Sequence, residues 1–361
     1  MSGIEYSFDE RPAYAATLPS RWYTDPAVLE REKEKIFSRA WQLVGRAEQV
    51  ARPGDYFTAA IADEPVIVAR GADEKLRAFS NVCRHRAGPV AEGCGNRKTF
   101  RCGYHGWTYA LDGRLLVTPE FDGVECFDRE SSALPEFKVE MWGGLVFVNL
   151  DPGCAPLGET LEDLPARAGI GEHKSFQLAA RKDWHVDCNW KVYVDNYLEG
   201  YHIPIVHPSL NRELDYARYR VETRRYYSIQ HSPIKRVDSA RLRPDESAPD
   251  KEAQYFWVFP NLMLNVYPDN YSTNLIVPLG PERTLTVFEW FFQDAGRPES
   301  QEQIQRVVEF SDEIQIEDIK ICEAVHRGLR SRNYKSGRYS VKRENGVHHF
   351  HGLIAECFAK D

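Results

Sequence analysis

The sequence lacks any run of about 18 apolar residues, which is the stretch that a transmembrane helix needs. It also lacks an excess of basic charge, because 46 Lys and Arg stand against 54 Asp and Glu and leave a net charge of -8. Phosphate binding requires a basic surface, so this balance argues against a nucleic-acid partner. The segment from Met1 to Ala13 has no apolar core of the kind that a secretory signal carries. We therefore expect a cytoplasmic protein with neither membrane nor nucleic acid as partner.

Cysteine is sparse, since eight residues are spread over 361 positions. That density is too low for a disulfide scaffold, and the cytosol would keep these thiols reduced. Metal ligation is the better use for any cysteines that cluster. Internal repeats and low-complexity tracts are also absent from the sequence.

The chain is long enough for two domains, each with its own core. We expect a helical segment over 1–40 that packs on the second domain, an all-β domain over 41–155 and a larger domain over 156–361. Asp25 and Pro26 predict the start of a helix that runs from Ala27 to about Ala40, with the charges from Glu30 to Lys35 on a solvated face.

Short β-rich runs separated by turn residues predict the first domain. They cover 41–44, 55–61, 65–69 and 76–79, and the run 141–150 predicts one buried strand at the end. A Pro- and Gly-broken stretch from Pro152 to Gly171 then predicts a linker. Apolar runs over 257–267, 272–279 and 285–292 predict an antiparallel sheet in the second domain. The charged stretch 218–249 is either a lid over the site or a solvated loop.

Two Cys and His pairs lie within the β-rich domain. The pattern is Cys83-x-His85, a gap of 16 residues, and then Cys102-x-x-His105. Zinc is one metal that such ligands bind, but zinc fingers place both cysteines in one pair and both histidines in the other. Here each loop carries one of each, which is the pattern of a Rieske [2Fe-2S] cluster. Glycines stand where the backbone has to approach such a cluster closely, at positions 88, 103 and 106.

The stretch 187–208 carries a second candidate metal site. On one continuous helix, Asp195, Glu199 and His202 would share a face, and Glu199 would stand beside the His202 imidazole. His207 lies five residues further on, so the helix has to break, and Pro204 supplies that break. Two imidazoles and a carboxylate on one face, with open positions opposite, describe a non-haem Fe(II) site.

The third ligand is predicted on a long helix near the C-terminus. Ile314, Asp318, Ile321 and Val325 recur at helical spacing, which would bury the Asp318 carboxylate on an apolar stripe. Burying an unpaired charge is costly, and metal ligation removes that cost. In the alternative, the apolar face of this helix is centred one position over, and Asp318 lies at the edge of that face. The substitute ligands are then Glu317 and Asp312.

With both motifs in view, the chain resembles the catalytic alpha subunit of a Rieske non-haem iron oxygenase, from Trp22 to the last helix. The resemblance implies an α+β protein, with an all-β Rieske domain ahead of a helix-grip catalytic domain. It implies that Cys83, His85, Cys102 and His105 bind the cluster, and that His202, His207 and Asp318 bind a mononuclear Fe(II).

The resemblance also implies partners. A flavin or iron-sulfur reductase would deliver electrons from NAD(P)H, and three chains would assemble head to tail. In the family, a carboxylate joins the second cluster histidine of one subunit to the first iron histidine of its neighbour. Here Glu199 would join His105 to His202, with Glu where many relatives have Asp. Asp195 is the other carboxylate of this stretch that we expect to serve catalysis.

As for the substrate, the sequences of segments 195–202 and 274–281 resemble in particular those of the choline, glycine betaine and carnitine oxygenases. A quaternary ammonium substrate calls for an aromatic cage. Several aromatic residues are candidates, although aromatics at sheet positions are more often core: Tyr193, Tyr197, Tyr201, Trp257, Phe259, Tyr267, Tyr271 and Trp290. Hydroxylation or demethylation of an aromatic substrate is the alternative, and a long aliphatic slot in place of aromatic faces and a carboxylate would favour it.

A protein that only transfers electrons through its cluster is a further alternative. It leaves 187–208, Asp318 and the second domain without a role. Iron analysis separates the two, because an electron carrier holds about two irons per chain and the oxygenase about three. We expect about three, measured on protein reconstituted anaerobically. Zinc in place of iron would support a structural module instead.

Overall fold

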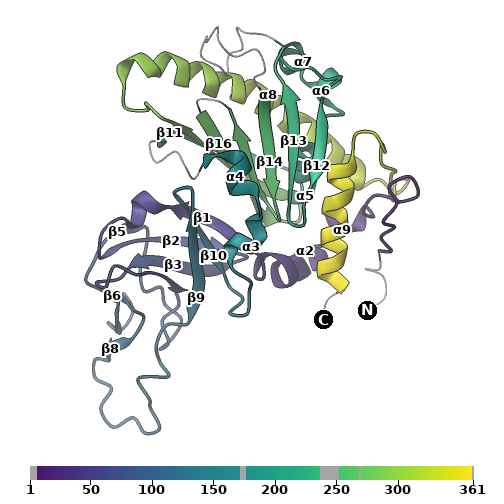
Figure 1. Cartoon of the computed structure of the whole chain (residues 1–361). Coiled ribbons are helices and arrows are strands. Elements are labelled where there is room, and N and C mark those ends of the chain that lie inside the picture. Colours follow the sequence, from purple (N-terminus) through teal and green to yellow (C-terminus); the bar gives the residue numbers. More distant parts are fainter. Residues whose placement is uncertain (1–5, 171–175, 236–251, 268–269, 360–361) are drawn as a thin grey trace. The chain divides into compact units, whose positions relative to one another are not determined.

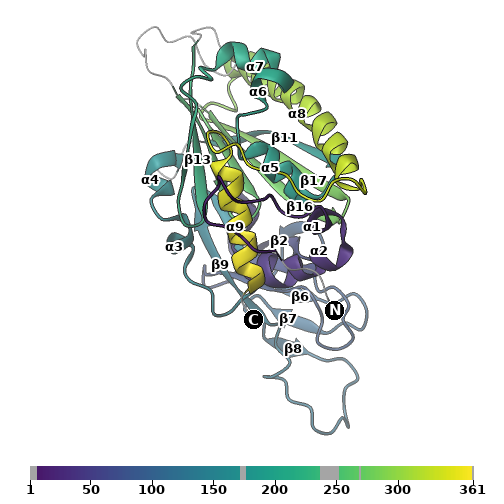
Figure 2. The same ribbon diagram turned by 90° about the vertical axis from the view of Figure 1, so that its right-hand side faces the viewer.

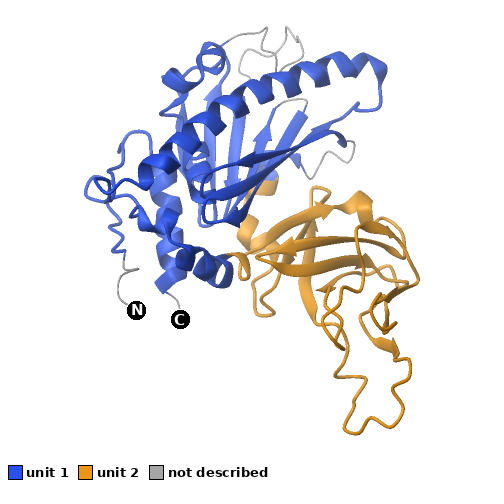
Figure 3. Cartoon of the chain, turned by 180° about the vertical axis from the view of Figure 1, so that it is seen from behind, with its two compact units in different colours: residues 1–36, 166–361 blue, residues 37–165 orange. Residues whose placement is uncertain are grey.

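The computed structural model describes residues 6–170, 176–235, 252–267 and 270–359. Two compact units emerge, one of residues 37–165 and one of residues 1–36 with 166–361 (Figure 3). We call them the small unit and the large unit. The domain limits expected at residues 40 and 155 stay predictions about which segments fold independently.

The small unit is built from two antiparallel sheets (Figure 1). The larger sheet has the order β1-β10-β9-β4-β3-β2-β5, and the smaller one has the order β6-β7-β8. Their bounds are β1 Gln42–Arg46, β2 Asp55–Ile61, β3 Glu64–Arg70, β4 Leu76–Ser80, β5 Cys94–Asn96, β6 Thr99–Arg101, β7 Thr108–Ala110, β8 Leu115–Val117, β9 Glu136–Trp142 and β10 Leu145–Asn149.

Strand β3 shows how one run of apolar residues supports two cores. Its alternating side chains point to opposite faces, so Val66 and Val68 enter one core while Ile67 and Ala69 enter the other. The second core also contains both cysteines of the Cys/His motifs, together with Trp107 and Tyr109. Packing therefore holds the motif loops against the sheet.

One expectation for this region was wrong. The run 141–150 is a hairpin, because Gly143 and Gly144 adopt positive φ angles of 58° and 82° between β9 and β10. Two adjacent left-handed residues make the tight turn that matches strand twist. The boundary between the two units falls within the expected linker, which also contains two short helices, α3 (Leu157–Leu161) and α4 (Leu164–Ala168), whose leucines 157, 161 and 164 are buried.

The large unit contains a seven-stranded antiparallel sheet within its described residues, in the order β11-β17-β16-β15-β14-β13-β12. Helix α8 lies along one face of this sheet, and α5 packs against both α8 and β16 (Figures 1 and 2). Helix α9 packs against β12. The bounds are β11 Gln177–Val186, β12 Arg220–Thr223, β13 Tyr227–Pro233, β14 Glu252–Val258, β15 Leu262–Val266, β16 Asn270–Gly280, β17 Arg283–Phe292, α5 Trp190–Tyr197, α6 Ile203–Val206, α7 Pro208–Glu213, η4 Pro298–Ser300, α8 Gln301–Leu329 and α9 Asn345–Ala359.

Neither alternative for 218–249, a lid or a solvated loop, describes its first half, which forms the edge hairpin β12–β13 of this sheet. Residues 236–251 lie outside the described residues. The run 257–267 belongs to two strands rather than one, because β14 ends at Val258 and β15 begins at Leu262. Pro260 lies between them, and proline cannot donate a hydrogen bond within a sheet. No helix among the described residues is long and apolar enough to cross a bilayer.

The N-terminal helix differs from its prediction. After α1 (Arg21–Thr24), α2 runs from Pro26 to Glu32, with the Asp25 carboxylate accepting from the Ala27 amide. A π-helical turn, η1 (Lys33–Phe37), then ends it. Its charged face is not wholly solvated, because Glu32 is fully buried.

Glu32 forms a buried ion pair with Lys191 of α5. Its Oε1 lies 2.5 Å from the Lys191 Nζ, its Oε2 accepts from the Trp190 indole at 2.7 Å, and neither charged side chain is exposed. Burial raises the pKa of Glu32 and lowers that of Lys191, and each partner opposes the shift of the other. The pair therefore joins the N-terminal segment to the helix that leads into the second candidate site.

Removing one charge of this pair should be costly. We expect Glu32→Gln to lower the free energy of unfolding by about 3 kcal/mol or more, because it leaves Lys191 buried without its counter-charge. Urea denaturation measures this. Arg11→Ala is the control, since it breaks an exposed ion pair with Asp9 in the same unit and should change stability little. If Glu32→Gln lowers the free energy of unfolding no more than this control does, the buried pair does not have the stabilising role described.

Candidate active site and metal centres

The first candidate site lies on two tight loops of the small unit. The Ala87 amide donates to the Cys83 carbonyl at 3.0 Å, and the Gly106 amide donates to the Cys102 carbonyl at 3.1 Å. Both loops thus close four residues after their cysteine. Gly88 allows them to approach, because a Cβ there would lie 3.0 Å from the Cys102 Sγ. Gly106 is required for its φ of 74°, whereas a Cβ on Gly103 would meet no described atom within 4 Å.

Thiols and imidazoles are separated in this site. The buried thiols of Cys83 and Cys102 contact each other, and the rings of His85 and His105 lie 4.6 Å apart. Among the described residues, only the group His202, His207 and Asp318 brings three donor atoms within 4.8 Å of one another. The four loop residues therefore do not meet around a single ion, which argues against zinc and fits a cluster two irons wide.

Electrostatics also fits a cluster. Burial, with the nearby Cys83 thiol, raises the pKa of Cys102, so two bare thiolates are disfavoured until metal coordinates them. Burial and the neighbouring His105 lower the pKa of His85, which favours a neutral imidazole suited to ligation. The His85 Nδ1 atom is buried with no hydrogen-bond partner. A metal bond satisfies such an atom.

Tyr109 is a residue near this site whose role the sequence did not reveal. Its hydroxyl oxygen lies 3.3 Å from the Cys83 Sγ and accepts from the Arg84 amide at 2.9 Å, so its own proton is directed to the sulfur. On the other side, Trp107 stacks on the His85 ring with centroids 4.9 Å apart. Tyr109 was visible in the motif as a tyrosine two positions after Trp107, but spacing alone did not place its hydroxyl.

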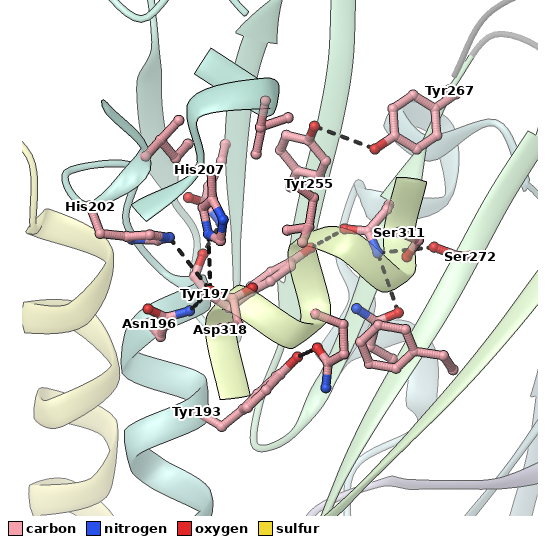
Figure 4. A pocket seen from close by; sticks show the side chains of 18 of the residues that line it. Tyr193, Asn196, Tyr197, His202, His207, Tyr255, Tyr267, Ser272, Ser311 and Asp318 are labelled. Atoms are coloured by element: carbon pink, nitrogen blue, oxygen red, sulfur yellow. Dashed lines mark hydrogen bonds and ion pairs between the residues drawn. The ribbon is translucent and has the colours of Figure 1, made fainter. Parts of the chain in front are cut away.

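The second candidate site lies in the large unit, where the predicted group His202, His207 and Asp318 converges (Figure 4). The Asp318 Oδ1 lies 3.0 Å from the His207 Nε2 and 3.9 Å from the His202 Nε2. His207 is buried and the other two side chains are mostly buried. Two imidazoles and one carboxylate on one side of a cavity fit a mononuclear Fe(II) with open positions.

The chain reaches this arrangement by a route that differs from the expected one. Helix α5 ends at Tyr197, so Asp195, Glu199 and His202 do not share one helical face. The Glu199 carboxylate accepts from the amides of Tyr201 and His202 and thereby holds a turn. Pro204 does not break a helix but lies in the first turn of α6, where a proline is tolerated.

Helix α8 also differs in phase. Its buried residues there are Gln315, Cys322 and His326, whereas Val325 of the expected stripe is 45% exposed. The apolar face is centred one position over, and Asp318 lies at its edge. Asp318 nevertheless points into the cavity, where Asn196 donates to its Oδ1 at 2.6 Å.

Each histidine of the group has a carboxylate on its second nitrogen. The Nδ1 of His202 lies 2.6 Å from Glu199, and the Nδ1 of His207 lies 2.7 Å from Glu317. Both Nδ1 atoms therefore donate, and both Nε2 atoms face the cavity. Burial alone would lower the pKa of His207, but hydrogen bonds to Asp318 and Glu317 outweigh it and raise the pKa. Glu317, expected as a substitute ligand, instead orients His207 in this structure.

Two expected carboxylates lie elsewhere. Asp312 contacts Lys182 of β11. Asp195 does not line the cavity: its Oδ2 accepts from Tyr23 at 2.7 Å and its Oδ1 lies 3.0 Å from the His351 Nε2. It therefore links α5 to the N-terminal segment and α9, and its expected catalytic role has no contact with the cavity to support it.

The cavity beside the three side chains is lined largely by aromatic and amide residues. Of the eight aromatic candidates, Tyr193, Tyr197, Tyr267 and Trp290 line it, and the other four do not. Sequence reasoning missed further lining residues. Most of them lie on strands whose facing was unknown, and Tyr219 comes just before β12: Tyr219, Gln230, Tyr255, Asn265, Asn270, Ser272, Asn274 and Phe288. The walls are therefore not those of a long aliphatic slot.

Comparison with known proteins adds to this geometry. Residues 40–128 match the family described as the Rieske [2Fe-2S] domain, and residues 174–360 match the ring hydroxylating alpha subunit (catalytic domain). The chloroplastic choline monooxygenase of Arabidopsis thaliana is 36% identical over 355 residues, covering 94% of this chain and 82% of that protein.

The carnitine monooxygenase oxygenase subunit of Acinetobacter pittii (strain PHEA-2) is 33% identical over 371 residues, covering 99% of each chain. A solved structure of a quaternary ammonium Rieske monooxygenase, described for carnitine oxidation by gut microbiota and inter-subunit electron transfer, is 32% identical. It matches with a TM-score of 0.86 and covers 96% of each chain.

A mainly β unit with paired Cys/His loops and an α+β unit with two histidines and a carboxylate define an iron-dependent oxidoreductase. The chain belongs to the Rieske non-haem iron oxygenases and is an enzyme of that type. Membership implies a [2Fe-2S] cluster and a mononuclear iron. The predicted family and the predicted α+β fold class are confirmed.

The Tyr109 hydroxyl offers a test of the first site that does not depend on turnover. Hydrogen bonds to cluster sulfur stabilise the reduced, more negative cluster, so we expect Tyr109→Phe to lower the reduction potential. Protein-film voltammetry measures it. Tyr56→Phe is the matched control, because its buried hydroxyl donates to the Glu92 carbonyl and contacts no motif cysteine. An unchanged reduction potential in Tyr109→Phe would contradict a hydrogen bond from this hydroxyl to the cluster sulfur.

Proposed function

We propose that the protein is the terminal oxygenase of a multicomponent monooxygenase that hydroxylates or N-demethylates a small quaternary ammonium compound of the choline, betaine or carnitine type. The observation that carries this is the cavity itself, where aromatic faces and the Glu199 carboxylate lie around a group of two histidines and an aspartate. Aromatic faces and carboxylates attract a methylated cation. The choline and carnitine monooxygenases among its relatives support the same substrate class.

The residues divide the work between two centres. Cys83, His85, Cys102 and His105 hold the [2Fe-2S] cluster, and His202, His207 and Asp318 hold the Fe(II). When bound, the two centres supply electron storage and oxygen activation. The protein contributes orientation: Glu199 and Glu317 hold the imidazole tautomers, Asn196 holds the Asp318 carboxylate, and the aromatic walls exclude water from the substrate.

A flavin or iron-sulfur reductase would supply electrons from NAD(P)H, and the chain would work as a homotrimer. Glu199 would then join His105 of one chain to His202 of the next. Two observations support this path. His105 is exposed at the tip of its loop, and Glu199 already contacts the imidazole that it would connect. The proposal includes a cytoplasmic location, because the reducing environment there would keep the thiols of Cys83 and Cys102 free to bind the cluster.

The alternatives have less support. An aromatic substrate would gain from an apolar slot, whereas several amides and hydroxyls line this cavity. A pure electron carrier leaves the convergence of His202, His207 and Asp318 unexplained. Turnover of a panel of choline, glycine betaine, carnitine and aromatic acids with NADH, oxygen and a surrogate reductase tests the proposal. Coupled turnover of aromatic acids alone would overturn it.

Glu199 is the residue that tests the path between centres. We expect Glu199→Gln to keep three irons per chain but to slow cluster oxidation about 10- to 100-fold, because one end of the Gln amide is a donor and cannot accept. The variant would therefore lose the hydrogen bond either to the His202 Nδ1 or to the two backbone amides. Rapid-mixing absorbance of the reduced enzyme with substrate and oxygen measures this. Glu313→Gln is the control, since that exposed carboxylate only accepts from Ser209. A wild-type rate of cluster oxidation in Glu199→Gln would show that Glu199 does not connect His105 to His202.

A further inference from the structure

Three polar side chains of the cavity lining hydrogen-bond to one another. Asn265 accepts from the Tyr197 hydroxyl at 3.0 Å. Its amide nitrogen donates to the Ser272 hydroxyl at 3.0 Å and to the Asn274 Oδ1 at 3.4 Å. We call Asn265, Ser272 and Asn274 the amide group, and all three side chains line the cavity.

Strand pairing places the amide group. Asn265 lies on β15 opposite Ser272 of β16, and Asn274 follows two residues further along β16. Residues two apart on a strand point to the same face, so Ser272 and Asn274 both face the cavity. Both residues are more than nine-tenths buried. In Figure 4, Ser272 lies across Tyr197 from the two histidines, so the amide group lies apart from the predicted iron ligands.

The amide group has hydrogen-bonding capacity left. A side-chain amide can make about four hydrogen bonds and a hydroxyl about three. Among the described residues, the Asn274 amide and the Ser272 hydroxyl each hydrogen-bond only to Asn265. Buried polar groups with unused capacity are costly unless water or a ligand fills it. Since amides and hydroxyls both donate and accept, the unused capacity is of both kinds and suits a ligand oxygen.

A compound of the proposed class can meet this capacity through one of its ends only. Its ammonium nitrogen carries four carbon substituents and no hydrogen, so it cannot donate a conventional hydrogen bond. The hydroxyl or carboxylate at the other end accepts hydrogen bonds readily. The oxygen-bearing end is therefore the one that fits the amide group.

The iron is a second position that would attract this oxygen. An iron held by His202, His207 and Asp318 would be a strong local positive charge. A substrate oxygen bound there would occupy one of the open positions that oxygen activation requires. A substrate oxygen at the amide group leaves those positions free.

Building on the proposed function, we infer that Ser272 and Asn274 form a subsite for the oxygen at the polar end of the quaternary ammonium substrate, whether a hydroxyl or a carboxylate oxygen. The subsite makes this oxygen a determinant of tight binding and holds it away from the iron. A quaternary ammonium compound without such an oxygen would leave the buried capacity of both side chains unfilled.

Matched ligands isolate the contribution of the oxygen. The members of each pair share a trimethylammonium group and differ at the other end: choline against ethyltrimethylammonium, and gamma-butyrobetaine against butyltrimethylammonium. Anaerobic titration calorimetry of the iron-loaded holoenzyme gives the four dissociation constants. In the pair that binds more tightly, we expect the oxygen-bearing member to bind at least about tenfold more tightly than its analogue, because it gains hydrogen bonds from buried groups.

Two variants assign this affinity ratio to the subsite. Asn274→Leu and Ser272→Ala should each lower the ratio about threefold or more, whereas general damage to the cavity would weaken both members of a pair alike. Thr273→Val is the matched control, because Thr273 is buried on the same strand but does not line the cavity, and its ratio should stay at the wild-type value. If Asn274→Leu fails to fold, the smaller change Ser272→Ala decides.

Two outcomes would overturn the inference while the proposed function stands. One is equal binding of oxygen-bearing and oxygen-free ligands by the wild-type protein. The other is an affinity ratio that stays unchanged in both variants, which would place the ligand oxygen elsewhere, for instance on the iron. If no quaternary ammonium compound binds and aromatic acids do, the proposed function fails and the inference fails with it.

Discussion

The large unit depends on one constraint: His202, His207 and Asp318, which could together bind a metal ion, have to be buried together although Asp318 is distant from both histidines in the chain. Asp318 and His207 are 111 residues apart, and their facing atoms lie 3.0 Å apart. An unpaired carboxylate and two imidazoles would be costly in an apolar core. The large unit offsets that cost with a polar partner for each, namely Asn196, Glu199 and Glu317. This candidate metal site is thus a hydrogen-bonded group in its own right.

The position of this group follows from how helices cover the sheet. Helix α8 lies along one face, α5 packs between α8 and β16, and the turn after Tyr197 directs His202 and His207 back towards α8. Gly200 permits that turn, since a Cβ there would lie 2.7 Å from the Tyr219 ring. The buried pair of Glu32 and Lys191 then fixes α5 to the N-terminal segment. Residues far from the cavity therefore set its geometry.

In the small unit, too, packing positions the candidate metal ligands, which here are two thiols and two imidazoles. There the sheet core buries the two cysteines, while the histidines stay at the loop tips, so thiols and imidazoles are separated. Tyr109 connects the core to the Cys/His loops, because its ring is part of the core and its hydroxyl contacts the Cys83 sulfur. Packing thus influences both the position of the cluster and its electronic environment.

Local patterns in the sequence were sufficient for the family, because Cys-x-His, Cys-x-x-His and the pair His202 and His207 are short-range spacings that chemistry restricts tightly. The ligand sets that they predict stay predictions. Strand runs were also readable, yet the Gly143–Gly144 turn and the helices in the expected linker were missed, since burial and turn geometry depend on neighbours distant in sequence. Only the tertiary structure decided that α8 presents Asp318 from the edge of its buried face, that Asp195 points to His351, and that Asn265, Ser272 and Asn274 line the cavity. Those facts depend on which strand and helix faces meet, and a pattern read along one segment contains no information about its partner.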